Sequence, residues 1–280
     1  MPEFAEVHEQ VRWLRSKVGA FKIAKHGFTG GHFPQWKDDP AKKQKVASFF
    51  DGAELLSISQ RGKHIVMALS TGTLTAHLMF SGRMTLLGDD YVSNYKHHRL
   101  PPDPKANSFW IESTDGLRLA LNDPEYRARA SAHPGLTAGQ CEDLTSLGPE
   151  ILVTSLTDAA FQTPWSAAQL ITAASASRTA IKVFLLEQER QAGIGNMYAC
   201  EGLYRAKIAP HRPAKSLSAA ELSALYNAIV AVVGEAIASQ LDYERVLAIY
   251  RKSHDPAGHE VKVDKIGGRD TYWVPAVQRV

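Results

Sequence analysis

The first eighteen residues carry apolar side chains at the spacing of a helix. Val7, Val11, Leu14 and Val18 recur every three or four positions, and charged residues fill most positions between them. A helix with this spacing is apolar on one face and polar on the other. The pattern predicts an amphipathic helix over residues 7–18.

Between residues 55 and 122 the helical spacing disappears, and short runs of β-forming residues alternate with turn residues. Glycines at positions 62, 72, 88 and 116 mark turns between these runs. Short strands separated by such turns are typical of an antiparallel β-sandwich or barrel. The predicted strands are Leu55–Ser59, His64–Leu69, Leu74–Met79, Arg83–Leu87, Phe109–Glu112 and Leu117–Asn122.

The pattern changes again near Leu147-Gly148-Pro149. Beyond this point Ala, Leu, Ile and Glu dominate, which favours helices. Close to the C-terminus, two β-like runs flank Gly267-Gly268, a dipeptide typical of a hairpin turn. We therefore expect two domains with a boundary near residue 150. The predicted helices are Trp165–Ala176, Ala180–Gln188, Gly195–Ala206 and Ala219–Ser239, and the predicted hairpin strands are Glu260–Ile266 and Thr271–Val274.

The composition is that of an ordinary globular protein. Of the 280 residues, 44% are hydrophobic and 22% are charged, which excludes a disordered tail protein. The formal net charge of +3 is a mild basic excess. This excess does not by itself indicate nucleic-acid binding, because the clustering of basic side chains on one face matters more than their number.

Targeting signals and metal-ligand patterns are absent from the sequence. The first ten residues lack the basic flank and apolar run of a secretory signal, and no window approaches the roughly 20 apolar residues that cross a bilayer. Cys141 and Cys200 share no metal-ligand spacing, the histidines show no spacing for a metal triad, and so few cysteines suit a reducing compartment. We expect a soluble, intracellular monomer without a metal or other cofactor.

The extreme N-terminus offers a nucleophile. Removal of Met1 exposes the secondary amine of Pro2, which titrates far below a lysine and can attack a sugar C1′ to form an imine. A Pro-Glu dipeptide alone more often starts a helix. Glu3 and Glu6 follow, and a carboxylate beside the amine can protonate the departing sugar oxygen; acidic residues also stabilise a helix N-terminus.

Two further segments are candidates for phosphate binding. Arg61-Gly62-Lys63-His64 lies at a turn between two apolar strands, where basic side chains reach a phosphate or are simply solvated. The segment QAGIGNMYA, residues 191–199, places two glycines before a helix that starts at Asn196. Backbone donors of such a turn can hold a phosphate. The GxGxxG fingerprint is absent, which argues against a dinucleotide-binding fold.

Five segments, in this order, carry a resemblance to a known family. PEFAEV, QRGKHIVMAL, HLMFSGRM, QAGIGNMYACEGLYRAKIAPHRPAKSLS and IGGRDTYWVPAVQ resemble the formamidopyrimidine-DNA glycosylase and endonuclease VIII family, and together they touch nearly the whole chain. The resemblance implies an α+β fold: an N-terminal antiparallel β-sandwich flanked by helices over residues 1–150 and a helical helix-two-turn-helix domain over residues 151–248. A hairpin finger over residues 249–280 completes it.

The resemblance also implies roles for single residues. Pro2 is similar to the Schiff-base nucleophile of the family, Glu3 to its general acid and Glu6 to a supporting carboxylate. Lys63 resembles the hairpin lysine at the phosphates of the lesion. The other implied DNA-binding positions are Asn196, Arg269, His77, Arg83, Phe80 and Arg127.

The chain departs from the family pattern in the finger. The positions of the four finger cysteines are taken by Ala257, Glu260, Val274 and Val277. One carboxylate and three small or apolar side chains cannot hold zinc. We therefore expect a zinc-less finger that is held by packing of Tyr272, Trp273 and Val274.

A second departure concerns the residues that fill the gap left by a flipped nucleotide. Where many relatives have Asp-Pro-Arg-Arg-Phe, residues 123–127 read DPEYR, so Glu125 replaces a basic void-filling residue. Phe80 stands where a methionine wedge is common. An apolar wedge needs only shape and low polarity, so Phe80 can enter a base step, and it can equally be a buried strand residue.

The resemblance implies a bifunctional DNA glycosylase and AP lyase of base excision repair. It would remove damaged, in particular oxidised, bases from double-stranded DNA by attack of Pro2 at C1′, followed by β,δ-elimination. The altered wedge and finger favour an endonuclease VIII-like range of lesions. Two alternatives stay open: a non-catalytic protein that binds lesions or abasic sites, and a glycosylase for cross-linked or single-stranded lesions.

Overall fold

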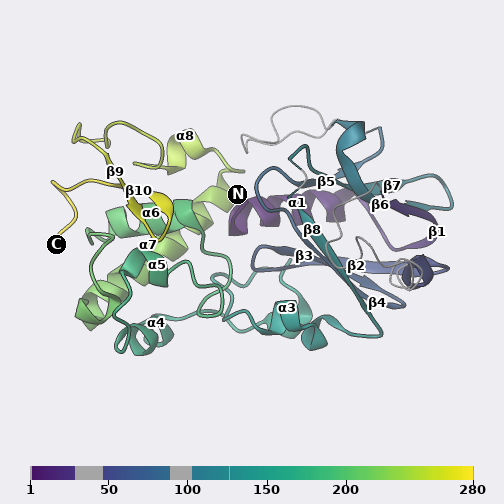
Figure 1. The fold of residues 1–280 in the computed structure, drawn as a ribbon, viewed down its shortest axis with the longest axis horizontal. Helices are drawn as coiled ribbons and strands as arrows, with labels where there is room; N and C mark the ends of the chain where they lie inside the picture. The colour runs from purple at the N-terminus through teal and green to yellow at the C-terminus, as the bar shows by residue number, and fades with distance from the viewer. Residues whose placement is uncertain (1, 29–46, 89–102, 126, 280) are drawn as a thin grey trace. The chain divides into compact units, whose positions relative to one another are not determined.

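The computed structural model describes residues 2–28, 47–88, 103–125 and 127–279 (Figure 1). Met1, whose removal the sequence interpretation assumes, and Tyr126 lie outside the described residues. The chain forms two compact units. Unit 1 contains Met1–Pro2, Glu6–Ser146 and Thr154–Gln162, and unit 2 contains Glu3–Ala5, Leu147–Val153 and Thr163–Val280.

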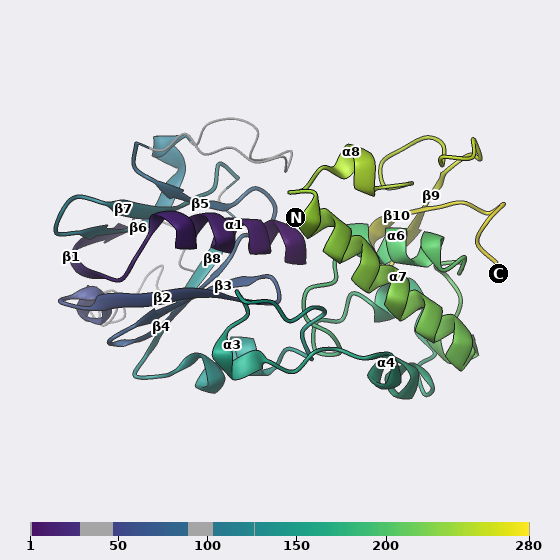
Figure 2. The same ribbon diagram turned by 180° about the vertical axis from the view of Figure 1, so that it is seen from behind.

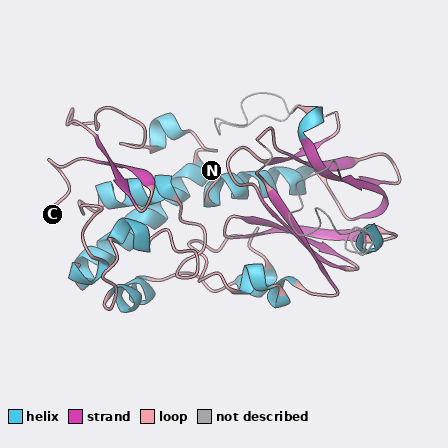
Figure 3. Cartoon of the chain, in the orientation of Figure 1, coloured by secondary structure: helices cyan, strands magenta, loops and turns pink. Residues whose placement is uncertain are grey.

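Unit 1 is built on an antiparallel sheet, drawn in magenta in Figure 3. Its strand order is β5-β7-β6-β1-β2-β3-β4-β8. β1 joins two halves of the sheet, β5-β7-β6 and β2-β3-β4-β8. Its first two residues pair with β2, and residues from Ile23 onward pair with β6. The strands are β1 Phe21–Phe28, β2 Glu54–Arg61, β3 His64–Leu69, β4 Gly72–His77, β5 Arg83–Leu86, β6 Asn107–Ser113, β7 Arg118–Asn122 and β8 Arg129–Pro134.

The hydrophobic core of unit 1 combines side chains from both halves of the sheet. Ile65 and Met67 of β3 join Ile111 of β6 and Leu119 of β7 in one buried cluster, together with the apolar face of α1 (Phe4–Lys17). Alternation along the strands therefore turns one side chain of every two into this core. The predicted β-sandwich flanked by helices is confirmed.

Two strands were not predicted from the sequence. β1 and β8 carry lysine, arginine, histidine and small residues rather than a run of β-formers. Their pairing partners on neighbouring strands define them. The amphipathic helix was predicted correctly, since Val7, Val11 and Leu14 are fully buried.

Unit 2 is mainly helical, as predicted. On α6, a Cβ on Gly202 would lie 2.3 Å from Ile229 Cγ1 of α7, so these two helices pack at very close range (Figure 2). The helices are α4 Ala167–Ala174, α5 Ile181–Phe184, α6 Asn196–Arg205, α7 Ala219–Ala238 and α8 Tyr243–Val246, and α3 Glu142–Thr145 belongs to unit 1. Short 3-10 turns occur at Pro104–Ala106, Ala138–Gln140, Ala159–Phe161 and Ala214–Ser216.

The helix predicted over residues 180–188 is only one turn long. The Gln191 side chain donates to the backbone carbonyls of Phe184, Leu185 and Glu187. These carbonyls therefore accept from a side chain rather than from a continuing helix. α5 accordingly ends at Phe184.

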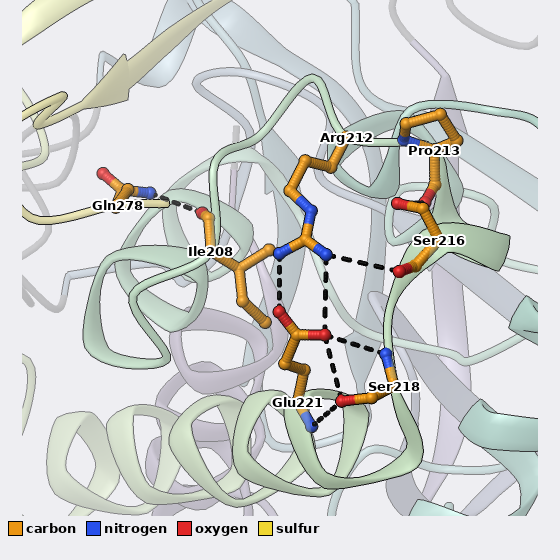
Figure 4. A network of polar contacts seen from close by, with 7 residues as sticks. All are labelled: Ile208, Arg212, Pro213, Ser216, Ser218, Glu221 and Gln278. Atoms are coloured by element: carbon orange, nitrogen blue, oxygen red, sulfur yellow. Dashed lines mark hydrogen bonds and ion pairs between the residues drawn. The ribbon is translucent and has the colours of Figure 1, made fainter. Parts of the chain in front are cut away.

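A polar network fixes the start of α7 (Figure 4). Ser218 and Glu221 form a capping box, in which the Ser218 hydroxyl accepts from the Glu221 N–H and the Glu221 carboxylate accepts from the Ser218 N–H. Arg212 donates to the same carboxylate at 2.6 Å. This guanidinium lowers the pKa of Glu221 to about 2.

α7 corrects one statement made from the sequence. Its 20 residues, Ala219–Ala238, are long and apolar enough to cross a bilayer by length and composition alone. The core helix of a soluble protein meets the same criterion, and Leu225, Ile229 and Val233 of α7 are fully buried.

The C-terminal hairpin has the predicted turn. β9 (Lys262–Ile266) and β10 (Arg269–Trp273) pair antiparallel, with Ile266 opposite Arg269. Gly267 and Gly268 both have positive φ, which glycine adopts without steric cost.

Candidate functional site

The Glu3 carboxylate of unit 2 is bound at the N-terminus of α6. It accepts hydrogen bonds from the backbone N–H of Met197 at 2.8 Å, of Gly195 at 3.0 Å and of Tyr198 at 3.2 Å. Only 3% of Glu3 is exposed. These donors are the unsatisfied amides of a helix start, where the helix dipole also favours negative charge. Glu3, the residue directly before α1, is thereby fixed in position by a helix almost 200 residues later in the sequence.

The two glycines of the QAGIGNMYA segment make this contact possible. A Cβ on Gly195 would lie 2.3 Å from Glu3 Cδ, and a Cβ on Gly193 would lie 2.8 Å from the Phe4 ring. The sequence interpretation assigned the backbone donors of this turn to a phosphate. That assignment is wrong for the three N–H groups that Glu3 occupies, because the glycines open the turn to a carboxylate of the chain itself.

Asn196 lies at the centre of a second set of contacts in unit 2. Its Oδ1 accepts from Lys182 Nζ at 2.6 Å, and its Nδ2 donates to the Asp270 carbonyl at 2.8 Å. Asp270 directly follows Arg269 on β10. The Asn196 side chain therefore connects the start of α6 to the strand that carries Arg269.

The hairpin turn is held against α5. A Cβ on Gly267 would lie 2.7 Å from Val183 Cγ2, so this glycine permits close contact with the helix. The charge of Arg269 contributes to the electrostatic environment of Lys182, the neighbour of Val183. Glu3, Asn196 and Arg269, three of the residues singled out from the sequence, thus belong to one region of unit 2.

Lys182 is the residue of this region that sequence reasoning missed. It is fully buried, and desolvation lowers its pKa, although the charges of Cys200 and Glu3 oppose that shift. Buried lysines are rare unless they are paired. The signal was present in the sequence as one lysine inside the apolar run Ala-Ile-Lys-Val-Phe-Leu-Leu.

In unit 1, the N-terminal candidates lie in a buried setting. Pro2 is buried directly before α1, and Glu6 in the first turn of α1 is also buried. On the same helix His8 Nδ1 lies 3.3 Å from Gln60 Oε1. Gln60 in turn donates to the Gly62 carbonyl at 2.9 Å, so α1 braces the turn that carries Lys63.

The basic residues of this turn do not project into solvent as expected. Lys63 exposes 5% of its surface and Arg61 exposes 3%. The Arg61 guanidinium stacks over the Phe161 ring at 4.4 Å and donates to the Leu144 carbonyl. Arg61 therefore has a structural role, whereas Lys63 is held on a turn closed by Gly62 with φ +54°.

His77 and His64 meet across β3 and β4. Their rings lie edge to face with centroids 4.9 Å apart. The Met79 N–H donates to His77 Nδ1, so the ring proton of His77 lies on Nε2. Burial lowers the pKa of His77 to about 3 and that of His64 to about 4, which makes both rings neutral at physiological pH.

Phe80 and Arg127, two predicted DNA contacts, lie side by side. The Arg127 guanidinium is 5.2 Å from the Phe80 ring centroid and 3.8 Å from the Glu125 carboxylate. The buried Asp123 carboxylate holds both segments, because it accepts from Ser81 Oγ and from the N–H groups of Glu125, Arg127 and Ala128. Glu125 is thus paired with Arg127, and the backbone N–H groups of both residues are held by Asp123.

Arg83, another predicted DNA contact, is buried in the sheet of unit 1. It is 3% exposed on β5, and burial lowers its pKa. Lys63 is nearly as buried, at 5% exposure, so burial alone does not separate Arg83 from the other predicted basic contacts.

The finger is organised by side-chain contacts. Val274 joins Ile249 and Val261 in a buried cluster against which Val277 and Tyr272 pack, and the Trp273 indole donates to Asp264 at 2.7 Å. The positions that correspond to two cysteines, Val274 and Val277, therefore contribute to an apolar cluster. Beside Ala257, which takes the position of another cysteine, Asp255 accepts from the N–H groups of Ala257 and His259 and from the Tyr204 hydroxyl.

One further group in unit 1 was not anticipated from the histidine spacing. One possible ligand atom of each of His133, Cys141 and Asp143 lies within 4.8 Å of the other two. Within the described ranges, this is the one group of three or more histidine, cysteine and carboxylate side chains that lie so close together. His133 and Asp143 are hydrogen-bonded at 3.2 Å, and Cys141 donates to the Thr137 carbonyl.

Comparisons with known proteins match nearly the whole length of the chain. Models of the formamidopyrimidine-DNA glycosylase family match residues 1–130 (N-terminal domain), 156–245 (H2TH domain) and 241–279 (C-terminal domain). A formamidopyrimidine-DNA glycosylase of Cereibacter sphaeroides is 32% identical over 275 residues, covering 96% of this chain and 89% of its own. One from Jannaschia sp. is 29% identical and covers both chains completely.

Solved structures share the fold. The Lactococcus lactis formamidopyrimidine-DNA glycosylase bound non-covalently to DNA with an AP site has a TM-score of 0.79 at 22% identity, covering 99% of this chain and all of its own. The same enzyme in complex with DNA that contains an oxidised pyrimidine gives a TM-score of 0.79 at 21% identity, with both chains fully covered.

Proposed function

Because the chain belongs to the formamidopyrimidine-DNA glycosylase family, we propose that it is a DNA glycosylase of base excision repair with AP-lyase activity and Pro2 as its nucleophile. The observation that carries the proposal is the fixed Glu3 carboxylate, which directly follows Pro2 and is held by three backbone donors of α6. Its intracellular location follows from the substrate, DNA.

The chemistry starts with the secondary amine of Pro2. Its lone pair attacks C1′ of the damaged nucleotide, the N-glycosidic bond breaks, and the base leaves with the bonding electron pair and takes up the proton that the Pro2 nitrogen loses. Ring opening at C1′ gives an iminium, and Glu3 supplies the proton that the sugar ring oxygen takes up. Loss of a C2′ proton then expels the 3′ phosphate, and a second elimination expels the 5′ phosphate. Glu6, buried in the first turn of α1, is proposed to support this proton transfer.

Phosphate binding is assigned to side chains of both units. Lys63 and His77 of unit 1, and Asn196 and Arg269 of unit 2, are the proposed contacts with the backbone of the damaged strand. Asn196 is suited to this role because Lys182 and the Asp270 carbonyl fix its orientation. Phe80 and Arg127 are proposed to enter the duplex as a stacked pair. Arg83 stays a further proposed contact, with an exposure of 3% beside 5% for Lys63.

The finger is proposed to work without zinc. Two sets of contacts take the place of a metal. They are the apolar cluster of Val274, Ile249 and Val261 and the backbone hydrogen bonds that Asp255 accepts. Residues 249–280 are accordingly proposed as the finger of a C-terminal region, after the domains 1–150 and 151–248. Stoichiometric zinc found in the protein by elemental analysis would contradict this proposal.

Borohydride trapping tests the proposed nucleophile. The wild-type chain with a free Pro2 amine should be trapped covalently on DNA with an abasic site. Pro2→Gly should lose most of this product, and an uncleaved N-terminal tag should abolish it. Trapping that survives both changes would overturn the assignment of Pro2.

The lesion is the open part of the proposal. The paired Glu125 and Arg127 differ from a basic void-filling segment, which favours oxidised pyrimidines and other endonuclease VIII-like substrates. Duplex, single-stranded and cross-linked oligonucleotides, each with one lesion, should be scored separately for base release and for nicking. Nicking only at preformed abasic sites would reduce the activity to that of a lyase, and binding without nicking would favour a lesion-binding protein.

A further inference from the structure

Unit 1 contains a pocket of about 380 Å³ on the face of β3, β4 and β8 that is turned away from the sandwich core. Register places His64, His77 and Arg129 in one row across the three strands, and Thr75 and Ser131 in the next row. The pocket is lined by His64, Thr75, His77, Met79, Arg129, Ala130, Ser131 and Asp143. Its volume is within the range of small-molecule sites.

Two buried acceptor atoms in this lining have no hydrogen-bond partner among the residues that the structure describes. They are His64 Nδ1 and Asp143 Oδ1. The other carboxylate oxygen, Asp143 Oδ2, accepts from Thr75 Oγ1 at 2.8 Å and contacts His133 Nε2 at 3.2 Å. Buried polar atoms without a partner are uncommon, so two in one pocket indicate a ligand or ordered water.

Both atoms can accept hydrogen bonds from the donors of a ligand. His64 is neutral because burial lowers its pKa to about 4, and its ring is hydrogen-bonded to the backbone of Arg61. Nδ1 therefore offers a lone pair. The Asp143 side-chain hydrogen bonds with His133 and Thr75 outweigh its burial and lower its pKa, so Oδ1 is a carboxylate acceptor.

Donors of the opposite kind lie in the same pocket. Arg129 is exposed, and His77 carries its proton on Nε2 because Nδ1 accepts from the Met79 N–H. A bare phosphate would meet the Asp143 carboxylate, and a bare metal cation would meet the Arg129 guanidinium. A ligand with N–H donors at one end and an anion at the other satisfies both sets.

We propose that this pocket binds an unpaired nucleotide of the DNA, which enters the pocket with its base ahead of its phosphate. The base edge then lies at His64 and Asp143, and the phosphate lies at Arg129 and His77. The inference rests on the proposed function only in taking DNA as the source of the nucleotide. Guanine presents two adjacent N–H donors on its pairing edge, whereas thymine presents one and cytosine and adenine each present one amino group. The pocket therefore prefers guanine.

Calorimetric titration with dGMP tests the proposal on the full-length protein. dGMP should bind the wild type, and Asp143→Asn should weaken this binding at least tenfold. Glu142→Gln is the matched control, because it removes the neighbouring, exposed carboxylate from the same turn of α3. It should leave the binding unchanged. Arg129→Ala, at an exposed position, should weaken dGMP severalfold and deoxyguanosine little.

Further arms separate the alternatives. dTMP and inorganic phosphate should bind at least tenfold more weakly than dGMP. Equal binding of any of these, no dGMP binding at millimolar concentration, or Asp143-dependent binding of Zn²⁺ in place of dGMP would overturn the proposal. Pro2→Gly should bind dGMP like the wild type, so this result is independent of whether the lyase chemistry exists.

Discussion

Two buried glutamates of unit 2 accept nearly the same set of hydrogen bonds and have different roles. Glu3 accepts three backbone hydrogen bonds at the start of α6, and Glu201, inside α6, accepts three from the N–H groups of residues 248–250 at 2.8–2.9 Å. Geometry alone would rank them equally. Three backbone donors alone therefore do not distinguish a proposed catalytic carboxylate from a structural one, and the position of Glu3 next to Pro2 is what does.

The difference lies in what each glutamate connects. Glu201 fixes the chain that follows α8, and no proposed reacting group is adjacent to it in the sequence. Glu3 directly follows Pro2, and the turn that binds it contains Gly195, where any side chain would collide with the carboxylate. The backbone of Gly195 is extended, with φ −123° and ψ −162°, so only the carboxylate requires glycine there. That requirement identifies the Glu3 contact as the one for which this turn is built.

The strongest test of the comparison is Gly195→Ala. The new Cβ would lie 2.3 Å from Glu3 Cδ and must displace the carboxylate. If Glu3 is the general acid, the single-turnover nicking rate on an abasic-site duplex should fall by about 10²–10⁴-fold. Glu3→Gln should show a loss of similar size.

Gly234→Ala is the matched control for that substitution. Gly234 lies in α7 with nothing within 4 Å of its Cβ position, so alanine there should stabilise the helix by about 1 kcal/mol. Its nicking rate should equal that of the wild type. A wild-type rate in Gly195→Ala would remove the argument that the turn serves Glu3.

Glu201→Gln should have the opposite profile. It leaves buried N–H groups of residues 248–250 with a weaker acceptor, so the free energy of unfolding should fall by about 1–3 kcal/mol. The nicking rate of the folded fraction should stay within a few-fold of the wild type. Urea denaturation and single-turnover kinetics on the same preparation separate the two effects. A rate loss as large as that of Glu3→Gln would equate the two glutamates.

The sequence predicted most elements and the wrong partner for the glycine-rich turn. Strands with alternating β-formers and the long apolar helices were predicted because burial on one face leaves a period in the sequence. β1 and β8 leave no such period, because basic and small residues interrupt the β-formers there, and these strands are defined by their pairing with β6 and β4. The backbone donors of α6 were assigned to a phosphate because no local pattern shows that a carboxylate 192 residues earlier occupies them.

Lys182 extends the comparison to a buried cation. Its Nζ donates to Asn196 Oδ1 at 2.6 Å, and Asn196 is a proposed phosphate contact. Lys182→Met keeps the packing volume and removes the donor, so Asn196 should lose its fixed orientation. We expect the dissociation constant for abasic-site DNA to rise about tenfold, the size of one hydrogen bond to a charged group. Lys215→Met, at an exposed lysine, is the control in the same fluorescence titration.

The smallest effect is expected from a carboxylate that is paired with a cation as well as with a backbone amide. The hydrogen bond from Arg212 lowers the pKa of Glu221 from 4.5 to about 2. A depressed pKa means that the ionised carboxylate stabilises the fold above about pH 4.5, and that this stabilisation is lost as the pH falls toward 2. Wild type should therefore be more stable than Glu221→Gln at about pH 6, and the difference should shrink by about pH 3. Urea unfolding at several pH values measures it. A difference that stays constant over this range would mean that the capping box at Ser218, and not the charge pair with Arg212, is what Glu221 contributes to α7.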